Sequence, residues 1–105
     1  MSNYVIAYYG GRKFESPAEA SAYMGKWRVW MGALGDALVN PGTPLGKSKT
    51  VNAGGVSEGA GTNRLTGYSI VRAASFDAAV DMAKACPHLE HGTIEVAEVM
   101  DMAMK

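Results

Sequence analysis

Four stretches of the chain carry the residue pattern of β-strands. Residues 3–9 are rich in β-branched and aromatic residues, and both of their alternating faces are apolar, which indicates a strand covered on both sides. Residues 49–53 form a short strand-like stretch, and residues 68–74 and 93–100 form longer ones. The glycine-rich residues 54–67 are typical of a flexible hairpin loop between the second and third strands.

Two amphipathic segments between these strands predict helices. Ser16-Pro17-Ala18-Glu19 is a helix start, with a serine cap, a proline at the first helical position and a glutamate that closes a capping box. Apolar residues then recur in steps of three and four through residues 20–38, and Asn40-Pro41-Gly42 is predicted to end this helix. Ser75 caps a second helix, which is predicted to end at Pro87.

The order of these elements is β-α-β-β-α-β, which is the split βαβ or ferredoxin-like pattern. Right-handed crossovers then predict an α+β fold with a four-stranded antiparallel sheet and two helices on one face. A chain of 105 residues suits one such domain, so residues 1–105 are interpreted as a single unit. The uncovered face of the sheet would expose apolar residues of the first strand, and we therefore expect a homodimer.

Composition excludes several classes of function. Lys and Arg total 10, as do Asp and Glu, so the net charge is zero and the chain lacks the basic footprint of a nucleic-acid-binding protein. Because no apolar run approaches the roughly 18 residues needed to span a bilayer, no membrane segment is predicted. A single cysteine cannot form an intrachain disulfide, which fits a reducing cytoplasm.

The predicted topology gathers several chemically useful side chains at one end of the sheet. The first strand ends there, the third begins there, and the second helix arrives there. A small carboxylate or enolate-like molecule would suit this end, because the first turn of the first helix offers backbone N–H groups to an anion. The candidate ligand-binding residues are Tyr8, Trp27, Asn52, Asn63, Tyr68 and His91.

His88 is the candidate catalytic residue at this end. It lies just past the second helix, where an imidazole can act as a general acid or base, and Glu95 on the next strand can orient it. The alternatives are a solvent-facing helix-end histidine and a solvated or interface glutamate. Trp27 shares a helix face with Trp30, and either core packing or stacking on a planar ligand explains that spacing.

Metal and cofactor sites are not predicted. Cys86, His88 and His91 lie close in sequence, but their spacing is irregular and a second pair of ligands is missing, so no metal is expected. The sequence Gly59-Ala60-Gly61 precedes no helix and does not indicate nucleotide binding, so no cofactor is expected.

Several segments of the chain resemble the YCII-related (DGPF-type) domain family. They are Y-V-I-A-Y-Y at residues 4–9, the pair Trp27 and Trp30, L-T-G-Y-S-I-V at 65–71 and A-K-A-C-P-H-L-E-H-G-T-I-E-V at 83–96. The resemblance implies a ferredoxin-like fold that dimerises through its sheets as a dimeric α/β barrel, with a pocket of histidine and acidic residues for which enzymatic activity has been suggested. The D-G-P-F motif itself is absent, and Ala97 stands where the family usually has an arginine.

Two classes of function therefore remain open for the chain. The first is a small cytoplasmic enzyme that uses His88 for acid–base chemistry on a small organic molecule. The second is a non-catalytic dimeric domain that binds a small molecule or a partner. The sequence does not identify the ligand.

Overall fold

The computed structural model describes residues 1–11, 14–58 and 64–100 of the chain. Its helices are α1 (Pro17–Leu34) and α2 (Phe76–Lys84), and short 3-10 turns follow them at Gly35–Ala37 and Pro87–Glu90. The strands are β1 (Ser2–Gly10), β2 (Leu38–Asn40), β3 (Lys49–Asn52), β4 (Gly55–Glu58), β5 (Leu65–Ala73) and β6 (Gly92–Glu98).

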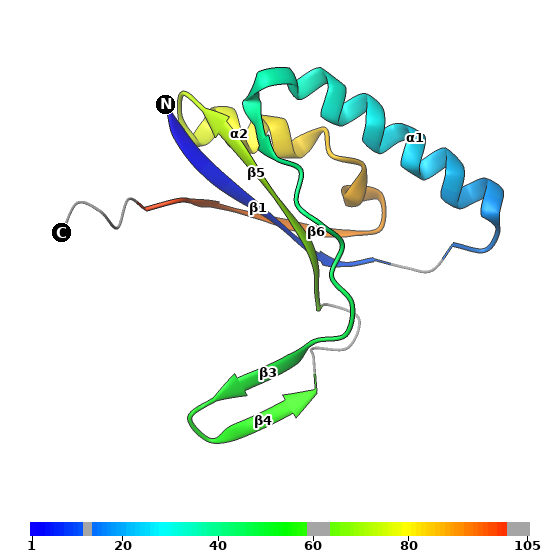
Figure 1. Cartoon of the computed structure of the whole chain (residues 1–105), viewed down its shortest axis with the longest axis vertical. Coiled ribbons are helices and arrows are strands. Elements are labelled where there is room, and N and C mark those ends of the chain that lie inside the picture. Colours follow the sequence, from blue (N-terminus) through cyan, green and yellow to red (C-terminus); the bar gives the residue numbers. More distant parts are fainter. Residues whose placement is uncertain (12–13, 59–63, 101–105) are drawn as a thin grey trace.

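The main sheet is four-stranded and antiparallel, with the order β2-β5-β1-β6. Both helices cover one face of this sheet (Figure 1). The predicted α+β fold is confirmed, with the strand order of a ferredoxin-like domain.

Serine caps start both helices, as the sequence predicts. The Ser16 hydroxyl accepts a hydrogen bond from the backbone N–H of Glu19 at 3.1 Å, and the Ser75 hydroxyl accepts one from Ala78 at 3.1 Å. Each bond satisfies an N–H group that lacks an intrahelical partner. The starts of both helices are therefore determined by local sequence.

The core lies between the helices and one face of the sheet. Strand β1 alternates strictly, so that Tyr4, Ile6 and Tyr8 are buried while the residues between them are only half-buried. The remaining core side chains come from β5, α1, α2 and the segment after α2, namely Val71, Ala73, Trp30, Ala79, Ala83 and Cys86.

Two element boundaries differ from the sequence prediction. Helix α1 ends at Leu34 and not near Asn40, because Gly35 adopts a positive φ of 54° and its N–H bonds the carbonyl of Met31. Residues Leu38–Asn40 then form β2 at the edge of the main sheet. Helix α2 ends at Lys84, and Pro87 starts a 3-10 turn that carries His88.

The stretch predicted as the second strand of the main sheet lies outside that sheet. Lys49–Asn52 pairs with Gly55–Glu58 in a separate two-stranded hairpin. A local turn favours this pairing, since the side-chain oxygen of Asn52 accepts a hydrogen bond from the N–H of Gly54 at 2.8 Å. The position expected for this stretch in the main sheet is taken by β2.

Neither described helix could act as a membrane span, because none combines the required length with sufficient apolar character.

Candidate functional site

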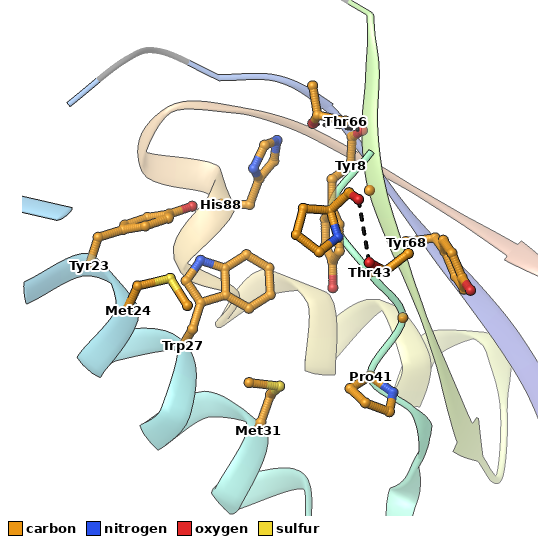
Figure 2. Close-up of a pocket in the computed structure, with 13 residues that line it drawn as sticks. Tyr8, Tyr23, Met24, Trp27, Met31, Pro41, Thr43, Thr66, Tyr68 and His88 are labelled. Atoms are coloured by element: carbon orange, nitrogen blue, oxygen red, sulfur yellow. Dashed lines mark hydrogen bonds between the residues drawn. The ribbon is translucent and has the colours of Figure 1, made fainter. Parts of the chain in front are cut away.

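A cavity of about 330 Å³ lies between α1 and the helix-covered face of the sheet, at the end where β1 stops (Figure 2). Its volume falls in the range of small-molecule sites. The lining residues are Tyr8, Tyr23, Met24, Trp27, Met31, Pro41, Gly42, Thr43, Pro44, Thr66, Gly67, Tyr68 and His88.

Helix α1 supplies one apolar wall of this cavity. Tyr23, Trp27 and Met31 follow each other at steps of four residues, and Met24 lies three residues before Trp27, so all four border one helix face. The ring of Trp27 meets that of Tyr8 edge-on with centroids 5.2 Å apart. The partner tryptophan of the sequence pattern, Trp30, belongs to the core and donates its indole N–H to the carbonyl of Met82 at 3.0 Å.

The opposite wall is the chain that follows β2. Gly42 has a φ of 74°, and a Cβ at this position would collide with the carbonyl of Tyr68, so only glycine allows the chain to lie against β5. The side-chain oxygen of Asn40 accepts a hydrogen bond from the N–H of Gly42 at 2.8 Å, and Pro44 forms a β-bridge with Gly67. The wall is thus held at both ends.

A buried chain of hydrogen bonds connects this wall to the sheet. The Tyr8 hydroxyl donates to the Ser69 hydroxyl at 2.7 Å, and the Ser69 hydroxyl donates to the carbonyl of Pro41 at 2.8 Å. Burial raises the pKa of Tyr8, so its hydroxyl keeps its proton. Tyr8 therefore offers the cavity its ring, while its hydroxyl is used in the structure.

His88 is the imidazole that lines the cavity. It is 7% exposed, and its ring centroid lies 5.3 Å from that of Tyr8. Its Nε2 atom is 2.9 Å from the carbonyl oxygen of Tyr9. A carbonyl oxygen can only accept a hydrogen bond, so Nε2 carries a proton, and Nδ1 is the ring nitrogen left to act as an acceptor in the neutral form of the ring.

The Nδ1 atom of His88 has no hydrogen-bond partner among the described residues. The described residues give His88 one side-chain hydrogen bond, which uses Nε2. No fully buried side-chain nitrogen or oxygen of the described residues lacks a partner, so Nδ1 is not sealed inside the protein. Figure 2 shows the hydroxyl of Tyr23 on the same side of the ring, directed toward His88. Burial raises the pKa of Tyr23, which keeps that hydroxyl a donor.

Gly92 makes room for the imidazole at the end of β1. A Cβ on Gly92 would meet the carbonyl of Tyr9 and would lie 2.6 Å from Nε2 of His88. The hydrogen bond between His88 and Tyr9 therefore requires a residue without a side chain at the start of β6.

Four of the expected site residues line the cavity, namely Tyr8, Trp27, Tyr68 and His88. Tyr68 borders the cavity, but its ring points away from the other rings (Figure 2), so it does not supply the hydroxyl donor that the sequence predicts. His91 does not line the cavity and packs between Phe14 and Tyr23, with ring centroids 5.6 and 4.8 Å away.

Two asparagines were also expected at the site. Asn52 is an exposed residue of the β3–β4 hairpin and does not line the cavity. Asn63 lies outside the described residues.

The expectation that Glu95 orients His88 is wrong. Glu95 is exposed and pairs with Ala7, on the face of the sheet that the helices leave uncovered. Its neighbours Ile94 and Val96 point the other way and pack against the core. His88 lies on the helix side, against the ring of Tyr8.

The predicted anion site at the start of α1 is also not part of the cavity. The α1 residues that line the cavity begin at Tyr23, beyond the first turn of the helix. Within that first turn the N–H of Glu19 is already bonded to Ser16, and the Glu19 carboxylate accepts a hydrogen bond from the N–H of Glu15 at 3.2 Å. These bonds use the N–H groups of Glu15 and Glu19, and the Glu19 carboxylate places a negative charge beside the start of the helix, which disfavours an anion there.

Sequence reasoning missed most of the apolar lining. Tyr23, Met24 and Met31 were readable as neighbours of Trp27 on one helix face. The segment from Pro41 to Pro44 carried no such signal, because its position depends on the pairing of β2 with β5.

The described residues contain no cluster of three or more His, Cys, Asp or Glu side chains arranged to hold a metal ion. Cys86 is buried among core residues, and burial raises the pKa of its thiol to about 11, so the thiolate that binds metals is disfavoured.

Comparison with known proteins identifies the family. No curated protein matches the chain. The family model of the YCII-related domain matches residues 4–103, which is nearly the whole chain. The chain therefore belongs to the YCII-related domain family.

Proposed function

We propose that the chain binds a small, planar, uncharged organic molecule in the cavity beside α1, and that Nδ1 of His88 accepts a hydrogen bond from an O–H or N–H group of this ligand. The observation that carries the proposal is the bond between Nε2 of His88 and the carbonyl of Tyr9 at 2.9 Å. It fixes the tautomer and leaves the cavity with an acceptor nitrogen.

The lining supports an uncharged ligand. The lining residues, all of them within the described part of the chain, include no Lys, Arg, Asp or Glu. A carboxylate or phosphate would lose its hydration here without gaining a cation, which costs several kcal/mol. Aromatic and thioether groups from Tyr8, Trp27 and Met31 suit the faces and edges of a planar ring instead.

The same geometry favours a second function, proton abstraction. An imidazole whose Nε2 is anchored on a backbone carbonyl can take a proton at Nδ1, in the way general bases are commonly oriented. His88 would then convert the bound phenol, enol or heterocycle into its conjugate base and return the proton in a later step. Because Glu95 lies on the other face, His88 would act without a carboxylate partner.

We further propose that the chain is a homodimer that pairs through the uncovered face of the sheet. Val5, Ala7, Tyr9, Tyr68 and Ile70 give this face an apolar surface that no described helix covers (Figure 1). Burying such a surface against a second copy removes it from water.

The single buried thiol of Cys86 fits a reducing compartment such as the cytoplasm.

A matched set of probes tests the cavity. Phenol carries an O–H donor, anisole has the same ring without the donor, and benzoate adds a charge. We expect phenol to bind about 3- to 10-fold more tightly than anisole, which is the usual value of one hydrogen bond. Chemical-shift titration of the wild-type protein gives the three affinities and shows whether the shifts map to the lining residues.

Two equivalent exchanges assign the effect to His88. His88→Phe keeps an aromatic ring beside Tyr8 and removes both nitrogens, and it should abolish the preference for phenol over anisole. His91→Phe makes the same exchange outside the cavity and should preserve that preference. Equal preference in wild type and His88→Phe, with both proteins folded, would contradict the proposal, as would tighter binding of benzoate than of phenol.

A further inference from the structure

The β3–β4 hairpin leaves the body of the domain as an arm. All residues of both strands, Lys49–Asn52 and Gly55–Glu58, are exposed. Val51 and Val56 lie opposite each other in the register and are 72% and 64% exposed. The arm therefore displays a cross-strand apolar pair to solvent.

An isolated hairpin of this size is only marginally stable in water. Among the described elements, β3 and β4 pack extensively only with each other. The ion pair between Lys49 and Glu58, at 3.9 Å, is exposed and contributes little. A stable arm thus requires another surface for its valines.

The direction of the arm indicates which surface this is. Figure 1 shows the hairpin projecting on the side of the sheet away from α1 and α2. That is the side of the apolar face formed by Val5, Ala7, Tyr9, Tyr68 and Ile70. If two copies pair through this face about a twofold axis, each arm lies beside the body of the other copy.

We propose that the β3–β4 arm clasps a second copy of this chain and lays the face that carries Val51 and Val56 against it. This inference rests on the proposed homodimer and extends its interface beyond the sheet. Charge does not oppose the contact: Lys49 and Glu58 share that face of the hairpin and balance each other. The chain as a whole has no net charge, so two copies do not repel each other.

The test compares the two faces of the arm. Val51→Thr together with Val56→Thr keeps the β-branched shape and strand propensity but removes the apolar contact. Thr50→Ala together with Ser57→Ala changes the opposite face of the same hairpin and serves as the control. Sedimentation equilibrium measures the dimer dissociation constant of each full-length protein, and circular dichroism checks that each is folded.

We expect the valine variant to weaken dimerisation by about tenfold or more, from the loss of two apolar contacts, and the control by less than about threefold. Amide exchange of the arm in wild type should slow as the protein concentration rises through the dissociation constant. An unchanged dissociation constant in the valine variant would contradict the proposed contact between the arm and a second copy. Amide protection of the arm that does not depend on protein concentration would contradict it as well.

A variant of the uncovered sheet face tests the proposed dimer separately from the proposed contact of the arm. Ile70→Asp places a charge on the uncovered face and should yield monomers. If Ile70→Asp is monomeric while the valine variant dimerises like wild type, the arm is refuted and the sheet dimer stands. A monomeric wild type at high micromolar concentration refutes both, and binding of phenol in the cavity is measured independently of either result.

Discussion

The two faces of the main sheet carry similar residues in very different settings. Along β1, Tyr4, Ile6 and Tyr8 are no more than 5% exposed beneath the helices. Val5 and Ala7, which alternate with them, are only half-buried on the other face. The strand is apolar on both sides, so the difference comes from what covers each side and not from the strand itself.

The polar groups of the two faces differ as well. On the helix side several polar groups are bonded within the chain, as the Tyr8 hydroxyl is to Ser69 and Nε2 of His88 is to the carbonyl of Tyr9. Glu95 stands on the other side and is exposed. A cavity with a fixed acceptor thus forms on the side that the chain completes by itself, whereas the other side is suited to a partner.

The largest expected change in the free energy of unfolding comes from shortening one side chain on each face of β1, and it tests the comparison directly. Ile6→Ala removes a fully buried side chain, and we expect it to lower the free energy of unfolding by about 3 kcal/mol. Val5→Ala on the opposite face should lower it by less than about 1.5 kcal/mol at low protein concentration. Urea denaturation followed by circular dichroism measures both.

The dependence on protein concentration sharpens the same comparison. The cost of Ile6→Ala should not change with concentration, because its neighbours belong to the same chain. The cost of Val5→Ala should grow when the dimer is populated. If both variants lost the same free energy of unfolding at every concentration, the two faces would not differ in the way proposed. The self-covered face, which the chain's own helices cover, would then be no different from the face that is proposed to need a partner.

Two glycine-to-alanine exchanges should change the free energy of unfolding by smaller amounts, one lowering it and the other raising it. Gly92→Ala forces the Tyr9 carbonyl or the His88 ring to move, and we expect it to cost about 2 kcal/mol and to remove the preference for phenol over anisole. Gly32→Ala lies on exposed α1 with nothing within 4 Å of the new Cβ, and should stabilise the protein by about 0.5–1 kcal/mol. Urea denaturation and the same ligand titrations check both, and a Gly92→Ala protein as stable as wild type would contradict the close packing around His88.

The sequence predicted the fold better than it predicted the site. The capping serines, the order of the elements and the apolar stripe of α1 are local signals, and they placed Trp27 and His88 at one end of the sheet. The end of α1 was missed because the apolar pattern continues through Ala37 and Leu38, although the helix stops at Leu34. For the same reason the sequence did not predict that the segment from Pro41 to Pro44 forms a wall of the cavity.

The error on Glu95 has a different cause. Successive strand residues face opposite sides, so the side of Glu95 depends on the register of β6 against β1. Both faces of β6 carry a glutamate among small or apolar residues, and the pattern alone therefore does not choose between them. The pairing of Glu95 with Ala7 and the space required at Gly92 are tertiary constraints.

The smallest expected effect concerns the thiol of Cys86, on the self-covered side. Burial raises its pKa from the ordinary value of 9.0 to about 11, and this is only partly offset by a hydrogen bond from the backbone of His88. Above pH 9 the thiol of the unfolded chain loses its proton while that of the folded chain keeps it. The stabilising contribution is therefore complete below pH 9 and is lost as the pH rises toward 11.

Cys86→Ala isolates this contribution. Between pH 8.5 and pH 10, wild type should lose about 1 kcal/mol more of its free energy of unfolding than the variant, since each unit of pKa shift corresponds to about 1.4 kcal/mol. Burial also raises the pKa of Tyr8, but that contribution begins near its ordinary value of 10.0, and burial, its largest cause, remains in the variant. Urea denaturation across this pH range gives the two curves. Parallel curves would mean that the thiol is as accessible as in the unfolded chain, and that the helix side is less completely covered than the packing of Cys86 indicates.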